Sequence, residues 1–176
     1  MPKIRAAELD DTPVLEKLIE QSVMVLQANE YSEAQRRGAL GTVFGVDSAL
    51  INDKTYFVVE AGGVIVGCGG WSQRKTLFGS DAIAGKDDQK LDPTRDAARI
   101  RAFFIKPGWE RRGIGRQILE TCETAARAAG FKHFELMATL TGVQLYSACG
   151  YEAGERSEAP LPNGLALPVV RMTKAA

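Results

Sequence analysis

The sequence predicts a mixed α/β or α+β protein, because β-rich segments and helix-periodic segments alternate along the whole chain. Its 176 residues fit one domain with a core large enough to fold alone. The hydrophobic fraction of 45% and the charged fraction of 25% are those of an ordinary globule and argue against disorder. We therefore expect a single domain over residues 1–176, with elements in the order β-α-α-β-β-β-α-β-α-β-β.

The first part of the chain predicts one short strand and three helical segments. The strand covers residues 3–7. Asp10, Asp11 and Thr12 are the N-capping choices for the next helix, which has Pro13 in its first turn and runs to about residue 27. The apolar residues of this helix recur at helical spacing: Val14, Leu15, Leu18, Ile19, Val23 and Leu26. A shorter helix is expected over residues 31–40, where a glycine ends it, and a further helical turn over residues 47–52.

A β-hairpin and a long connection follow. Residues 55–61 are rich in β-forming side chains and run into two glycines, after which residues 64–72 supply the second strand. The glycines within residues 67–70 do not open a helix, so we interpret them as strand glycines. Residues 74–96 carry ten charged side chains. A loop of this length is often a lid or a binding loop, and a solvated insertion is the alternative.

The second half predicts a strand over residues 98–105, stopped by a Pro-Gly pair, and a helix over residues 114–129. The helix has one apolar stripe, with Glu123 and Arg127 paired four residues apart on its solvent side. A strand, a short helix and two closing strands complete the domain: residues 132–138, 142–148, 151–155 and 165–173.

Composition excludes several classes of function. With 22 basic and 22 acidic residues the chain has no net charge, so it does not bind nucleic acid by bulk electrostatics. No apolar run approaches the ~20 residues of a membrane span, and residues 1–5 lack the core of a secretion signal, which predicts a cytoplasmic protein. Three scattered cysteines and the single His133 predict no metal site, no disulfide framework and no nucleophilic triad.

The segment of residues 103–116 predicts an anion site, because a strand, a tight loop and a helix start follow one another. Gly113 and Gly115 let a ligand approach the backbone amides of the first helical turn. Three arginines lie on the same turn: Arg111, Arg112 and Arg116. Since like charges repel unless an anion compensates them, a pyrophosphate is the favoured ligand. In the alternative reading, the glycines merely let the helix pack closely against a strand.

Two motifs in this part of the chain resemble those of a known family. The run Arg111-Arg112-Gly113-Ile114-Gly115-Arg116 resembles the acetyl-CoA loop of the GNAT N-acetyltransferase superfamily. About 30 residues later, Leu145-Tyr146-Ser147-Ala148-Cys149-Gly150-Tyr151 resembles its second hallmark. Glu110 departs from the family pattern, which has Gln or Arg there. The resemblance covers nearly the whole chain and implies the GNAT acyl-CoA N-acyltransferase fold, with a mixed, mostly antiparallel central sheet flanked by helices.

The resemblance also implies roles for single residues. Phe103, Phe104 and Ile105 pair through their backbone with the pantetheine arm, and the backbone of residues 111–116 holds the pyrophosphate of acetyl-CoA, with Ile114 between the two glycines. Tyr146 takes the position of the general acid, for which a core tyrosine with a bonded hydroxyl is the alternative. Thr139 is the nearest substitute for the family's asparagine. Glu135 matches a strand position where some members carry a base, against the alternative of an exposed salt bridge.

The implied reaction is the direct attack of a bound primary amine on the thioester, with both reactants held in a ternary complex. The sequence leaves the acceptor open, either a small molecule or a peptide, and Tyr31, Trp71 and Arg74 are candidates to line its site. An acyl-CoA-binding sensor or interaction module without turnover is the alternative function. A homodimer is possible by family analogy, and no nucleic acid, membrane or metal partner is expected.

Overall fold

A computed structural model describes residues 2–83 and 86–176 and contains one seven-stranded sheet in the order β1-β2-β3-β4-β5-β7-β6. The strands are β1 (Lys3–Ala6), β2 (Tyr56–Ala61), β3 (Val64–Ser72), β4 (Ala98–Ile105), β5 (His133–Thr139), β6 (Glu152–Pro160) and β7 (Ala166–Ala175). Neighbouring strands run antiparallel except β4 and β5, which are parallel. The predicted mixed, mostly antiparallel sheet is therefore confirmed.

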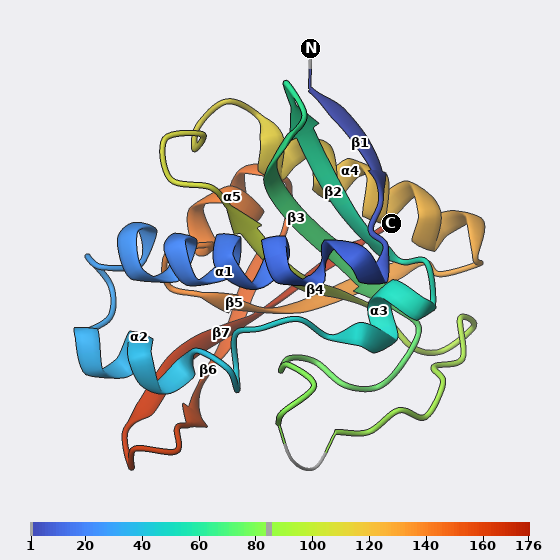
Figure 1. The fold of residues 1–176 in the computed structure, drawn as a ribbon. Helices are drawn as coiled ribbons and strands as arrows, with labels where there is room; N and C mark the ends of the chain where they lie inside the picture. The colour runs from blue at the N-terminus through green and yellow to red at the C-terminus, as the bar shows by residue number, and fades with distance from the viewer. Residues whose placement is uncertain (1, 84–85) are drawn as a thin grey trace.

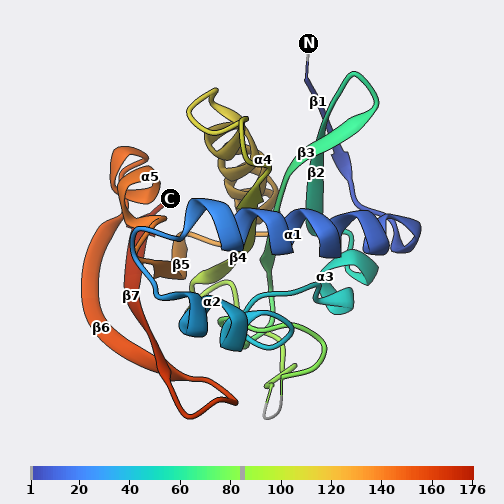
Figure 2. The same cartoon turned by 60° about the vertical axis from the view of Figure 1, so that its left-hand side comes forward.

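Helices cover both faces of this sheet (Figures 1 and 2). A short 3-10 helix (Leu9–Asp11) leads into α1 (Thr12–Leu26), which lies across one face with α2 (Glu33–Ala39) and α3 (Ser48–Asn52). The other face is covered by α4 (Ile114–Ala128) and α5 (Val143–Ala148). Each face has its own apolar cluster, built around Leu15, Ile19 and Phe104 beneath α1 and around Ile118, Phe134 and Tyr146 beneath α4 and α5. None of the helices in the described residues is long and apolar enough to cross a membrane.

The middle of β4 contains a bulge that the sequence did not predict. Gly67 pairs with Ile105 and Cys68 with Phe104, but the next pair is Gly70 with Arg101. Two residues, Ala102 and Phe103, thus lie opposite the single Gly69, and Ala102 has a positive φ of 57°. A Cβ on Gly69 would lie 2.5 Å from the Phe103 ring, so glycine is needed there for close approach.

The two parallel strands separate soon after they meet. Only Ala98 with Phe134 and Arg99 with Glu135 form ladder pairs between β4 and β5. Beyond these pairs the remaining residues of β4, up to Ile105, have no ladder partner on the β5 side within the described chain. The two strands therefore form a V whose open end points toward the start of α4.

The connection over residues 74–96 contains no helix or strand in its described parts apart from one isolated bridge, between Arg74 and Lys90. It is held to the body of the domain by charge. Arg101 is buried and donates to Asp47 Oδ2 (3.0 Å) and to the carbonyl of Gly79 (2.9 Å), and Lys86 pairs with the same carboxylate at 2.8 Å. These contacts fix the described parts of the connection beside α3 and β4.

Two sequence expectations need correction. Glu123 does pair with Arg127 (3.3 Å), but its side chain is buried rather than on the solvent side. It accepts from Tyr151 Oη at 2.9 Å and from Lys174 Nζ at 2.9 Å, so β7 and the start of β6 cover that face of α4. The closing strands are also longer than expected, because the hairpin continues through Pro160 and Pro168. β6 is an edge strand, and Pro168 precedes Val169, the first residue of β7 paired with β5, so neither proline interrupts the sheet.

Candidate functional site

The loop before α4 presents a row of unpaired backbone amides. Gly113 is the N-cap of α4 with a φ of 82°, no side chain caps the helix, and Arg111 also has a positive φ, of 62°. Within the described chain the N–H groups of residues 111–116 donate to no acceptor, and the first amide bonded there is that of Gln117, to the Gly113 carbonyl (3.0 Å). Successive amides of this kind at a helix start form a concave nest for an anion.

The two glycines of this loop do different work. A Cβ on Gly113 would meet nothing within 4 Å, so Gly113 is required by its left-handed backbone and leaves open space in front of the amides. A Cβ on Gly115 would lie 2.9 Å from Leu145 Cδ2, so Gly115 lets α5 pack closely against α4. The close-packing interpretation therefore applies to Gly115 alone, and its neighbour is the helix α5 rather than a strand; the anion-site interpretation, which concerns Gly113, stays a prediction.

The side chains around the amide nest make its mouth positive. The exposed Arg111, Arg112 and Arg116 form no ion pair with any acidic side chain in the described chain. The Arg112 guanidinium lies 4.6 Å from the centre of the Trp109 ring, which holds it near the loop. Glu110, the departure from the family pattern, accepts from the Gly108 amide at 2.7 Å and so shapes the loop.

The unpaired edge of β4 leads from this mouth into the V between β4 and β5. Phe103 and Ile105 are half-buried and Phe104 is buried, while their backbone on the β5 side has no ladder partner. An extended ligand can pair with such an edge as an added strand would. The bulge at Ala102 and Phe103 lies at the inner end of this edge and re-aims the backbone there.

Tyr146 on α5 lies beside the bulge. Its ring packs edge-on against Phe103 (centroids 6.0 Å apart) and Tyr151 (5.9 Å). Its hydroxyl forms no hydrogen bond with any described residue, unlike the bonded hydroxyl of Tyr151. Burial raises the pKa of Tyr146 above its ordinary value, so the phenol is protonated at neutral pH. Within the described residues, this protonated hydroxyl therefore has no hydrogen-bond partner.

Thr139 and Glu135 are both engaged with other groups. The Thr139 hydroxyl accepts from the Gly142 amide at 3.0 Å and so shapes the turn into α5. Glu135 accepts from Arg99 Nη1 at 2.5 Å and from Arg171 Nε at 2.6 Å, one guanidinium on each carboxylate oxygen. The salt-bridge alternative for Glu135 is correct as to contact and wrong as to exposure, because the residue is buried.

The three residues suggested for the acceptor site pack against, or form hydrogen bonds and ion pairs with, other parts of the domain. Tyr31 is buried and its hydroxyl donates to the Pro168 carbonyl (2.6 Å) while it accepts from the Leu140 amide (2.9 Å). Burial raises the pKa of this hydroxyl to about 12. Trp71 packs against Phe131 beneath α4, and Arg74 pairs with Asp53 at 2.8 Å.

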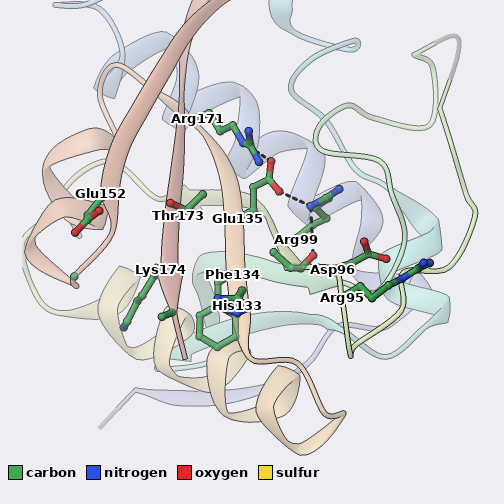
Figure 3. A pocket seen from close by; sticks show the side chains of 13 residues that line it. Arg95, Asp96, Arg99, His133, Phe134, Glu135, Glu152, Arg171, Thr173 and Lys174 are labelled. Carbon is green, nitrogen blue, oxygen red and sulfur yellow. Dashed lines mark hydrogen bonds and ion pairs between the residues drawn. The ribbon is translucent and has the colours of Figure 1, made fainter.

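A cavity of about 700 Å³ lies against β4, β5 and β7, with Arg99, Glu135 and Arg171 in its wall (Figure 3), and Tyr31, Trp71 and Arg74 do not line it. Sequence reasoning missed the two arginines. The signal that could have found them is a charged residue among apolar neighbours on a strand expected to be half-buried, at Arg99 on β4 and at Arg171 on β7.

This fold, with a V between two parallel strands and an amide nest at its open end, is that of solved GNAT-type N-acetyltransferases. The sequence of residues 21–151 matches the acetyltransferase (GNAT) family, and the chain belongs to that family. Comparison with curated proteins finds no match. Among solved structures, a GCN5-related N-acetyltransferase from Rhodopseudomonas palustris superposes with a TM-score of 0.74 at 21% identity, covering 100% of this chain and 96% of that one.

Two other similar structures were solved with a ligand. The PaiA N-acetyltransferase of Thermoplasma acidophilum, in complex with coenzyme A, has a TM-score of 0.69 at 14% identity and covers 100% of this chain and 99% of that one. The putative acetyltransferase yncA of Salmonella typhimurium, with acetyl-CoA, has a TM-score of 0.64 at 15% identity and covers 99% and 94%. At these identities the likeness shows the fold. In the described residues of the present chain, no cluster of His, Cys, Asp and Glu could hold a metal ion.

Proposed function

We propose that this chain is an N-acetyltransferase that moves the acetyl group of acetyl-CoA to a primary amine of a small molecule or peptide. The observation that carries the proposal is the run of amides at residues 111–116, which have no acceptor within the described chain and open onto the edge of β4 that has no ladder partner there. The nest suits the diphosphate of coenzyme A, and Arg111, Arg112 and Arg116 add positive charge around it. Residues Phe103, Phe104 and Ile105 pair with the pantetheine arm through their backbone.

Acetyl-CoA supplies the thioester that the amine attacks. The chain holds the two reactants in line in a ternary complex, which can be worth up to ~7–11 kcal/mol of the barrier. The backbone amide near Ile105 donates to the oxygen on which negative charge develops. Tyr146, protonated and without a hydrogen-bond partner among the described residues, gives its proton to the departing sulfur, whose free thiol has an ordinary pKa near ~8.5.

The amine must lose a proton to attack, and Glu135 is the proposed base, acting through water. Its contacts with Arg99 and Arg171 hold both oxygens in place, and because each oxygen accepts only one guanidinium N–H, each keeps a second lone pair for an approaching water. Thr139 contributes to the cofactor site by fixing the turn that leads into α5 and thus the position of Tyr146.

Release of free CoA from acetyl-CoA, measured over a panel of primary amines for the wild type and Tyr146→Phe, tests this function. We expect tyrosine-dependent release with at least one amine. Tight binding of acetyl-CoA without any tyrosine-dependent release would instead indicate a binding module without turnover.

A further inference from the structure

One row of polar side chains crosses four strands on the face of the sheet next to the cavity. Arg99 pairs in register with Glu135, Glu135 with Thr173, and Thr173 with Glu152. Arg171 lies two residues before Thr173 on β7, so it projects from the same face. Figure 3 shows the Arg99 and Arg171 side chains pointing toward Glu135 from opposite sides. Two cations thus share one buried carboxylate, and the trio carries a formal charge of +1.

The trio leaves hydrogen-bond donors unused. Arg171 donates to Glu135 through Nε alone, and its two terminal nitrogens reach no acceptor in the described residues. The Nη2 of Arg99 is likewise without an acceptor there. The side chain of Arg171 is 51% exposed and that of Arg99 15%, so Arg171 is the more accessible of the two. A guanidinium with a free terminal fork matches the geometry of a carboxylate.

The other charged residues of the cavity wall are less suited to this. Arg95 pairs with Asp92 at 3.3 Å, and its side chain is 77% exposed, so solvent screens an ion pair there more than at Arg171. Lys174 is committed to the buried Glu123, and the Asp96 carboxylate accepts from the Asp92 amide at 2.7 Å. Glu152, at the far end of the row, is exposed and repels a carboxylate from its own end. An anion is therefore favoured at the end of the row that carries Arg99 and Arg171.

We infer that the acetyl acceptor carries a carboxylate, and that Arg171, steadied by Glu135 and assisted by Arg99, binds it in this cavity. The inference rests on the proposed function. The cavity reaches the last paired residues of β4 and β5, directly before the V opens. Arg99 precedes the bulge at Ala102 by three residues, which is about 10 Å along a strand. The carboxylate and the reacting nitrogen are therefore expected at opposite ends of an extended acceptor, not on neighbouring carbons.

Matched acids and amides test this. We would measure kcat/KM with acetyl-CoA for 6-aminohexanoate against 6-aminohexanamide, and for glycine against glycinamide. The expected result is a preference of at least tenfold for the acid in the long pair and none in the short pair. Arg171→Gln should remove the preference, so that acid and amide turn over at the same kcat/KM. Because Arg171 also holds one oxygen of Glu135, the readout is the ratio of acid to amide within the same variant, in which a change in the base cancels. Glu135 keeps its bond to Arg99 in this variant, so the fold is retained.

The matched control is Arg37→Gln, since Arg37 also pairs with a glutamate but lies on α2, with a side chain that is 65% exposed. It should leave the preference intact. Calorimetric binding of glutarate to the CoA-saturated protein gives a second readout that needs no turnover, and this binding should be lost in Arg171→Gln.

Equal rates for the long acid and amide in the wild type would overturn the inference while leaving the acetyltransferase intact. Where no amine turns over, failure of glutarate to bind would overturn it. If the wild type neither binds acetyl-CoA nor acetylates any amine, that result would contradict the proposed function instead.

Discussion

Replacing Gly113 separates two requirements of this position: a left-handed backbone conformation and open, uncharged space in front of the amides. Its φ of 82° lies where L-residues pay ~1–2 kcal/mol, while an added Cβ would touch nothing within 4 Å. Gly113→Ala should therefore lower the free energy of unfolding by about 1 kcal/mol, which shifts the melting temperature by roughly 2–4 °C in a domain of this size. The methyl group adds no charge, so the affinity for CoA should fall only modestly.

Gly113→Glu carries the same backbone cost and adds a carboxylate in front of the amides. At ~4 Å, one carboxylate and one phosphate charge repel by about 1 kcal/mol in bulk water and ~4 kcal/mol at an effective dielectric constant of ~20. CoA should then bind roughly fivefold to several hundredfold more weakly than to Gly113→Ala. Calorimetry measures the CoA affinity of both variants, and thermal unfolding measures their stability. Equal CoA affinities in the two variants would refute the placement of the diphosphate.

Three further predictions follow from the same geometry. Tyr146→Phe should lower kcat by about 100-fold, with little change in CoA affinity or melting temperature because the hydroxyl has no partner in the described protein. Since the pKa of Tyr146 is raised, a pH–rate profile of the wild type should show no loss of activity from this residue below about pH 10. Arg112→Ala should weaken CoA binding severalfold in dilute buffer and less in 0.5 M salt, since the arginine is exposed and its field is screened; a salt-independent loss would contradict this. Asp47→Asn should lower the free energy of unfolding by about 3 kcal/mol, because it leaves the buried Arg101 without its carboxylate, and denaturant unfolding measures the loss.

The pH dependence of the Asp47 contribution has a definite sign. Burial opposes the charged form, but hydrogen bonds and charge from Lys86 and Arg101 hold the pKa of Asp47 below its usual value. The carboxyl of the unfolded chain titrates near ~3.9. Its contribution is therefore present above about pH 4 and is lost as the pH falls through the folded-state pKa. The stability difference between wild type and Asp47→Asn should shrink in acid, and a difference that grows there would contradict the assignment.

Much of the fold could be predicted because local signals agreed with it. Pro13, the apolar stripes of α1 and α4 and the glycines after β2 each point to the element that forms. The amide nest was predicted for the same reason, since the loop and the helix start are local in sequence. The different roles of the two glycines were not predicted, because only the tertiary contacts show that Gly115 faces Leu145 while Gly113 faces open space.

The features that escaped prediction depend on residues far apart in the chain. The bulge at Ala102 arises from the pairing of β3 with β4, and the burial of Glu123 depends on Lys174, which lies 51 residues further along the chain. The same holds for the contact of Arg171 with Glu135, which requires β7 to insert between β5 and β6. Strand order in the sheet is set by long-range packing, so such partners cannot be read from spacing.

The most direct test of the account is a crystal structure of the protein with acetyl-CoA. We predict that the diphosphate accepts hydrogen bonds from the amides of residues 111–116, that the pantetheine arm lies along Phe103–Ile105, and that the sulfur lies within hydrogen-bond reach of the Tyr146 hydroxyl. An acetyl-CoA molecule bound at another place, or a loop that stays empty at saturating ligand, would contradict it.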